Sequence, residues 1–238
     1  MMSSPVKPSV VSELREIAYG NERWMLLRKY RKHAESIMLS LEKAHLPCIL
    51  YGSVARGDID EHSDIDIFIP ECVSSFSVEN ALEKANIPII TRFVVQATPS
   101  FVMKAYLEVN AQTNVSFPLM PMTKPQKEFF TFSGAIDLDG LLSDKRVPGV
   151  DKRLMLIEPT SHGHIETSIA GQEDYAAKIL SISAATVRSR VRVLLRRDTV
   201  GRTGLFIKRE LHPNETFEQV LQRLACENPA VRRRLHTQ

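Results

Sequence analysis

The stretch LYGSVARGDIDEHSDIDIFIP, residues 50–70, constrains the fold more than any other part of the sequence. Near its end Asp64 and Asp66 alternate with isoleucines. Because side chains at i and i+2 of a strand project from one face, the two carboxylates share a face while the isoleucines enter a core. Carboxylates this close raise each other's pKa unless a cation lies between them. Oxygen ligands suit Mg²⁺ or Mn²⁺, so the pattern indicates a divalent-cation site on a sheet.

The first part of the same stretch indicates a site for an anion. The apolar residues 49–51 predict a strand, and Gly52-Ser53 predicts a tight exit into a short helix. The first backbone N–H groups of a helix lack partners within it and favour phosphate. An anion site beside a cation site implies a metal-bound nucleoside triphosphate. Each feature alone is weak, because an aspartate pair is often only a strand end that faces water.

In this order and spacing, the residues resemble the signature of the DNA polymerase beta-like nucleotidyltransferase superfamily, which is Gly-Ser followed on the next strand by Asp-x-Asp. Here Gly52-Ser53 precedes Asp64-Ile65-Asp66, and residues 55–57 read Ala-Arg-Gly, as is often seen in the small prokaryotic and archaeal members. The resemblance extends over residues 45–120. It implies transfer of a nucleoside monophosphate from a nucleoside triphosphate to a hydroxyl of RNA, protein or a small molecule, with release of pyrophosphate.

The resemblance also implies roles for individual residues. Asp64 and Asp66 would be catalytic and would bind Mg²⁺ or Mn²⁺. Gly52 and Ser53 would bind the β and γ phosphates through a backbone N–H and a hydroxyl, and Arg56 would neutralise charge nearby.

The sequence departs from the family pattern at the third carboxylate. Asn114 stands where an aspartate is expected, and a neutral amide holds a hard cation weakly. Glu108 is the best substitute, and Asp137 or Asp139 is a weaker one. If none of them binds the metal, we expect instead a DNA-binding transcriptional regulator. Its nucleotidyltransferase domain would sense nucleotide and would be catalytically weak. This is the alternative to the transferase.

Composition sets wider limits. The 238 residues include 43 % hydrophobic residues and carry a net charge of +3, which suits one large globular domain or two small ones. Three isolated cysteines, without a C-x-x-C pair, suggest neither a zinc knuckle nor a disulfide framework. The amino terminus lacks a signal-peptide pattern, and no apolar run is long enough to span a membrane. We therefore expect a cytoplasmic protein with no membrane partner.

The predicted fold class is α/β (α+β), with a small mixed sheet under helical cover followed by a domain resembling a helix-turn-helix or winged helix. We expect helices and strands over these ranges: helices at 12–44 and 77–86, and strands at 48–52, 64–69, 89–96, 104–111 and 113–119. Residues 121–165 predict further strands and loops, with the alternating residues His162, His164 and Glu166 in a polar loop or surface edge rather than a metal site. The sequence predicts three domains. They are residues 1–46, an amino-terminal tail and helices packing on the catalytic domain; 47–165, the nucleotidyltransferase domain; and 166–238, the helix-turn-helix domain with a basic carboxy-terminal tail.

The last third resembles the helix-turn-helix of bacterial and archaeal regulators. Ala177, Ile182 and Val187 fall where that motif has a small residue, a buried turn residue and a core residue. Ser183 is placed to cap the second helix, although Ser181 stands where the turn usually has glycine. Residues 201–210 would form a small wing.

Arginines crowd the predicted second helix, which suits a surface that binds phosphate backbones, although charge runs are more often solvated helix faces. Such domains commonly act as dimers, so a homodimer is an option. The candidate nucleic-acid contacts are Ser183, Thr186, Arg188, Arg190, Arg196 and Arg197.

Overall fold

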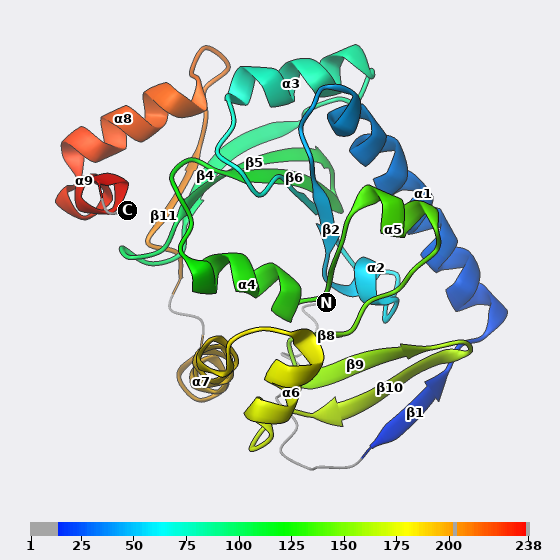
Figure 1. The fold of residues 1–238 in the computed structure, drawn as a ribbon. Coiled ribbons are helices and arrows are strands. Elements are labelled where there is room, and N and C mark those ends of the chain that lie inside the picture. Colours follow the sequence, from blue (N-terminus) through cyan, green and yellow to red (C-terminus); the bar gives the residue numbers. More distant parts are fainter. Residues whose placement is uncertain (1–13, 202–203, 237–238) are drawn as a thin grey trace.

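The computed structural model describes residues 14–201 and 204–236, which form a mixed α/β fold, as expected, with two sheets and surrounding helices (Figure 1). In this part of the chain the larger sheet has the strand order β11-β4-β5-β6-β3-β2-β7. Its strands are β2 (Ile49–Tyr51), β3 (Ile65–Phe68), β4 (Thr91–Gln96), β5 (Met103–Asn110), β6 (Thr113–Pro118), β7 (Ala135–Ile136) and β11 (Ile207–Glu210). Only β3 and β6 pair in parallel; the other neighbours are antiparallel.

The strand registers line up polar residues in a row across the larger sheet. Tyr51 lies opposite Asp66, Asp66 opposite Asn114, Asn114 opposite Glu108, and Glu108 opposite Thr91. Directly paired residues of neighbouring strands place their side chains on one face. This face, which we call the polar face, therefore carries the Asp-x-Asp residues, and the isoleucines between them lie on the other face.

The other face of the sheet is covered by helices that close the main hydrophobic core. They are α1 (Asn21–Lys43), α3 (Ser75–Lys84), α5 (Leu138–Leu142), α8 (Phe217–Glu227) and α9 (Pro229–His236). The ring of Phe217 in α8 meets the ring of Phe117 in β6 edge-on, at 5.7 Å between centroids. Sequences from both ends of the chain thus close the same core.

On the polar face, the helix α4 (Lys124–Phe132) covers β2 and β3. The ring of Phe130 stacks on Phe68 at 3.8 Å between centroids and meets Tyr51 edge-on at 4.9 Å. The expectation of only strands and loops in 121–165 is therefore wrong here. The start signals were present in the sequence, since Pro125 lies in the first turn and the side chain of Gln126 accepts the N–H of Thr123.

The smaller sheet has the order β1-β10-β9-β8 within the described residues. Its strands are β1 (Arg15–Ala18), β8 (Gly149–Val150), β9 (Met155–Thr160) and β10 (Gly163–Ser168). The expectation of helix from residue 12 is wrong, since β1 pairs with β10 and the helix begins at Asn21. His164 and Glu166 lie buried in β10 rather than in a polar loop; the Tyr19 hydroxyl lies 2.5 Å from Nδ1 of His164, and Arg153 donates to Glu166 at 2.7 Å.

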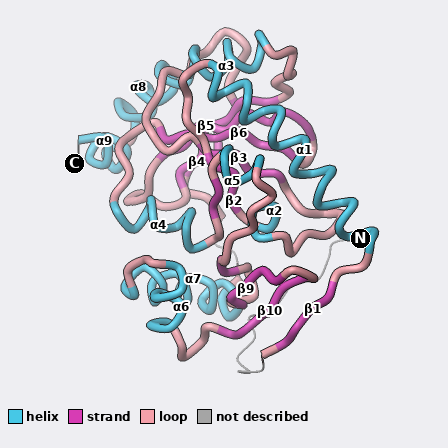
Figure 2. Tube along the Cα trace, turned by 45° about the vertical axis from the view of Figure 1, so that its right-hand side comes forward, coloured by secondary structure: helices cyan, strands magenta, loops and turns pink. Residues whose placement is uncertain are grey.

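Residues 166–238 contribute to both cores. The helices α6 (Glu173–Leu180) and α7 (Ala184–Val200) join a second core with β8 and β9, below the larger sheet (Figure 2). The expectation of a wing beside this helix pair is wrong, because β11 hydrogen-bonds to β4 at the edge of the larger sheet.

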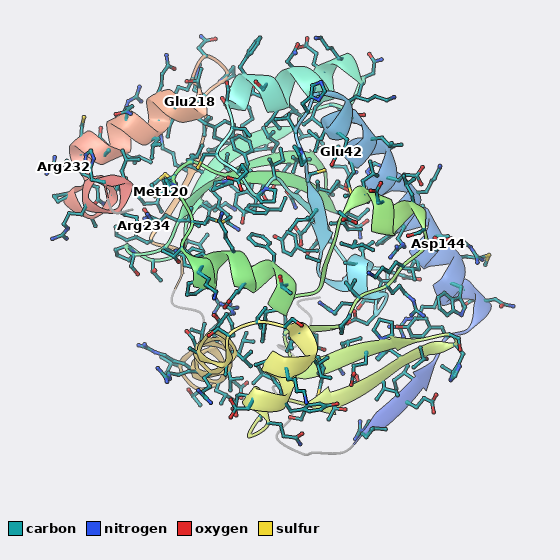
Figure 3. All side chains as sticks on the ribbon, in the orientation of Figure 1. Glu42, Met120, Asp144, Glu218, Arg232 and Arg234 are labelled. Carbon is teal, nitrogen blue, oxygen red and sulfur yellow. The ribbon has the colours of Figure 1, made fainter. Side chains whose placement is uncertain are left out.

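The carboxy-terminal helices are attached to the larger sheet by polar contacts as well. Glu218 accepts the backbone N–H and the hydroxyl of Ser75, both at 2.8 Å, and so ties α8 to the start of α3 (Figure 3). Arg234 of α9 donates to the carbonyl of Pro121 at 2.6 Å, just before α4. Over the described ranges, no helix is both long and apolar enough to cross a membrane.

We expect Phe217→Ala to lower the free energy of unfolding by about 3–5 kcal/mol, because Phe217 is fully buried in the main core. Phe76→Ala, at a ring that is 74 % exposed, should change it by less than about 0.5 kcal/mol. Urea denaturation of both variants measures the difference. Equal stabilities would contradict the packing of α8 against the larger sheet.

Candidate active site

The turn from β2 into the short helix α2 (Ser53–Arg56) is a candidate site for an anion. Gly52 has φ 88° and ψ −152°, a backbone conformation that is essentially restricted to glycine. Its N–H donates to the carbonyl of Gly134 at 2.9 Å. The backbone N–H groups of Ser53 and Val54 make no hydrogen bond within the described residues, nor does the hydroxyl of Ser53. These three donors can therefore receive the oxygens of a phosphate.

The two aspartates of the signature lie at the start of β3. Asp64 is exposed directly before the strand, and Asp66 is partly buried within it. Burial raises the pKa of Asp66 to about 6, and the charge of Asp64 adds to this effect, while Lys104 and Lys152 oppose it. The two lysines do not offset the effects of burial and of Asp64, and a divalent cation would add the further positive charge.

Asn114 completes the polar side of this site. Its Oδ1 atom is buried and has no hydrogen-bond partner in the described part of the chain, a costly state for a polar atom. In the sheet it lies directly opposite Asp66. An oxygen without a partner beside two carboxylates suits the donor set of Mg²⁺ or Mn²⁺. The residues Asp64, Asp66 and Asn114 thus fit the metal that the sequence predicts.

Glu108, the predicted substitute for the missing carboxylate, lies one strand further from Asp66 than Asn114 does. The strand that carries Asn114 separates Glu108 from Asp66, which places their backbones about 10 Å apart at the usual strand spacing. No three Asp, Glu, His or Cys side chains are grouped to hold a metal anywhere in 14–201 or 204–236. Asp137, the weaker substitute, caps α5 by accepting the N–H of Gly140. Of these candidates, Asn114 is the one that lies directly opposite Asp66 in the sheet.

The guanidinium of Arg56 forms hydrogen bonds within the protein, whereas the sequence predicts that it contacts phosphate. Its side chain is buried, and its Nε and Nη2 donate to Asp58 at 2.9 and 2.8 Å. Its Nη1 donates to the carbonyl of Ser133 at 2.6 Å. The guanidinium thereby fixes the loop after α2 against the end of α4. We assign it a structural role.

Lys104 is a candidate that the sequence analysis missed. It lies on β5 with a largely buried side chain. The Nζ of this side chain has no ion pair or hydrogen bond with another described residue. Its Nζ is 5.0 Å from the ring centre of Tyr106 and 5.8 and 5.7 Å from those of Phe68 and Phe130. Because these rings come from three separate elements, strand periodicity alone gave no signal of an unpaired cation near Asp66.

Tyr51 forms an aromatic wall of the site. Burial raises the pKa of its hydroxyl well above the usual value, and the charge of Asp66 adds to this. Its ring meets Phe129 and Phe130 of α4 edge-on, at 6.4 and 4.9 Å between centroids. The hydroxyl therefore stays protonated at neutral pH.

Two of the predicted nucleic-acid contacts on α7 face α4 instead. Thr186 is buried and its hydroxyl donates to the carboxylate of Glu128. The guanidinium of Arg190 lies 4.8 Å from the ring centre of Phe129, and burial, with a smaller effect of Arg197, lowers its pKa to about 10. Both predictions are wrong, because these side chains fill the contact between the two helices.

The other candidates on α7 remain at the surface. Ser183 caps the helix by accepting the N–H of Ala185. Arg188 pairs with Asp174 of α6 at 2.5 Å. Arg196 and Arg197 are exposed and form no ion pair with another described residue. Among the exposed arginines that the sequence predicts to contact nucleic acid, these last two are the ones without an ion pair to another described residue.

Asp66→Asn should raise the free energy of unfolding at pH 8, by on the order of 2 kcal/mol. The folded protein holds the Asp66 proton more tightly than the unfolded chain, so the parent loses stability as pH rises from the unfolded pKa of 3.8 to about 6. The advantage of the amide variant should therefore shrink below pH 6 and vanish near pH 4.

Urea denaturation across this pH range measures the effect, with Glu83→Gln as the control at an exposed carboxylate. In a parallel series Mn²⁺ should stabilise the parent and not Asp66→Asn. A pH-independent difference, or equal stabilisation by Mn²⁺, would contradict the environment described for Asp66.

Comparison with known proteins identifies this part of the chain. Residues 32–120, which are less than half of the chain, match the family model described as Nucleotidyltransferase domain. That match includes β2, α2 and β3 with both aspartates, and it ends after β6.

Among solved structures, the complex of a CCA-adding enzyme with ATP shares 14 % sequence identity with this chain. The match covers 94 % of this chain and 51 % of that protein, with a TM-score of 0.32. The chain thus spans about half the length of that enzyme. No curated protein matches the sequence.

Proposed function

We propose that this protein is a metal-dependent nucleotidyltransferase that moves a nucleoside monophosphate from a nucleoside triphosphate to a hydroxyl and releases pyrophosphate. The observation that carries the proposal is the position of Asp64 and Asp66 beside the unpartnered Oδ1 of Asn114. The match of residues 32–120 to the nucleotidyltransferase domain supports it.

Each part of the site has a separate role in this proposal. The free donors of Ser53 and Val54 bind the terminal phosphates at the glycine turn, and the positive charge of Lys104 attracts the negatively charged substrate on the aromatic side of the site. Asp64, Asp66 and Asn114 would hold the divalent cation, which would neutralise the triphosphate and lower the pKa of the attacking hydroxyl. Tyr51 and α4 shield this side from water.

The neutral Asn114 supports a second candidate function. An amide contributes no charge to a cation site, so turnover would be slower than with three carboxylates. In that case the domain would bind a nucleotide as a sensor, and α7 would bind DNA in response. The two candidates differ in one measurable property, which is covalent transfer of label.

We further propose that α6 and α7 form a nucleic-acid-binding unit. Ser181 adopts the left-handed conformation at φ 54° and ends α6, and Ser183 caps α7. Ala177 and Val187 are buried between the helices, as such a unit requires. The unit comprises residues 173–200 and is smaller than the domain expected from the sequence.

Purified protein given each α-labelled nucleoside triphosphate, Mg²⁺ or Mn²⁺, and cellular RNA should transfer label to an acceptor. Asp64→Asn with Asp66→Asn should reduce the rate at least about 1,000-fold, because the charge that holds the cation is lost. Glu83→Gln serves as the control variant. Nucleotide binding without transfer by the parent would overturn the transferase and support the sensor.

Arg196→Gln with Arg197→Gln should weaken binding of duplex DNA or structured RNA and lower the slope of log affinity against log salt by about 2, since each lost phosphate contact contributes about 0.9. The matched control is Arg28→Gln with Lys29→Gln, at exposed cations of α1. Fluorescence anisotropy at several salt concentrations measures both. Equal slopes for the two variants would contradict a specific role of α7.

A further inference from the structure

The polar face of the larger sheet has an uncovered half. Over β2 and β3 it is closed by α4, but Tyr106 on β5 and Phe93 on β4 are both partly exposed. The two residues are direct partners in the strand register. Their rings stack with an angle of 4° between planes and 5.2 Å between centroids. A pair of parallel aromatic rings therefore lies at the surface, one strand beyond Asn114.

A lysine flanks this ring pair at each end. The Nζ of Lys208 on β11 is 5.0 Å from the centre of the Phe93 ring, and the Nζ of Lys104 is 5.0 Å from that of Tyr106. Neither lysine forms an ion pair with another described residue. We call Lys104, Tyr106, Phe93 and Lys208 the aromatic strip. A carboxylate, Glu210, lies at the outer edge of the strip, opposite Phe93 in the register.

The aromatic strip and the glycine turn lie on opposite sides of the aspartates along the larger sheet. The glycine turn that would hold the terminal phosphates follows β2, on one side of β3. The aromatic strip begins on β5, on the other side of β3 and beyond β6. In phosphoryl transfer the attacking and leaving oxygens lie roughly in line through phosphorus. A group held on the aromatic strip therefore faces the side opposite the leaving pyrophosphate.

We propose that the aromatic strip binds the terminal bases of a single-stranded polynucleotide and presents its end hydroxyl to Asp66. This deepens the proposed function, on which the acceptor role rests. Bases of any sequence stack on aromatic rings, and an adjoining exposed lysine, here Lys208, pairs with a phosphate between them. Two partly exposed aromatic rings beside the exposed, unpaired cation of Lys208 match a base-and-phosphate chain, whereas a compact sugar or a peptide hydroxyl offers no bases to stack.

The test measures binding without turnover. Oligonucleotides of RNA and of DNA, with 2-aminopurine at the 3′ end or in the interior, are titrated with protein in the absence of nucleoside triphosphate and metal. Stacking on the aromatic strip should change the fluorescence of the 3′ probe more than that of the interior probe. Phe93→Leu with Tyr106→Leu should weaken binding about 10-fold or more and remove this difference.

Lys208→Gln provides the second variant, because this exposed side chain can be changed without disturbing the core. It should lower the slope of log affinity against log salt by about 0.7, as expected for one phosphate contact of a single strand. The controls are Phe76→Leu and Lys84→Gln, exposed residues of the same types on α3, and both should bind like the parent. Preference of the parent for RNA or DNA identifies the acceptor.

Binding by the variants that equals that of the parent, or a loss shared by the control variants, would overturn the proposal. Transfer to a small molecule or a protein that is unaffected in the variants would overturn it as well. Oligonucleotide binding that depends on the aromatic strip, together with an absence of label transfer, would leave the binding surface in place and reject the transferase.

Discussion

The register between β2, β3, β6 and β5 is the constraint on which the rest of the molecule depends. It places one polar residue from each strand in a single row, from Tyr51 through Asp66 and Asn114 to Glu108. A slip of one residue in β3 would turn both aspartates into the core and the isoleucines toward the site. The burial of Ile65 and Ile67 therefore fixes the chemistry of the site as firmly as the fold.

The fold near the signature could be predicted from local patterns. The alternation around Ile65 and the glycine turn at residue 52 are patterns between residues that are close in the sequence. Both correctly predict the strands that the structure contains. The departure at Asn114 was also visible, since it depends on position along one strand. The sequence could not supply the order of the strands, which places Asn114 beside Asp66 and Glu108 one strand further away.

Other features depend on which surfaces meet in three dimensions. Arg56 has the charge of a phosphate ligand, but Asp58 and the carbonyl of Ser133 occupy it. Arg190 has the charge of a nucleic-acid contact, but Phe129 covers it. Lys104 lies in a strand of ordinary appearance, and only the rings of three different elements make it unusual. Charge in a sequence predicts a binding role only when the fold leaves that charge unpaired.

The helix α4 lies between two parts of the protein that the sequence presents as separate. Thr186 and Arg190 of α7 contact its residues Glu128 and Phe129, and the ring of Phe129 in turn contacts Tyr51 beside the aspartates. A ligand that moves α7 must either break these contacts or carry α4 with it. Binding at α7 and binding beside the aspartates therefore both depend on the packing of α4. By thermodynamic linkage, a ligand at α7 that changes the affinity of the site beside the aspartates has its own affinity changed by the same factor when that site is occupied.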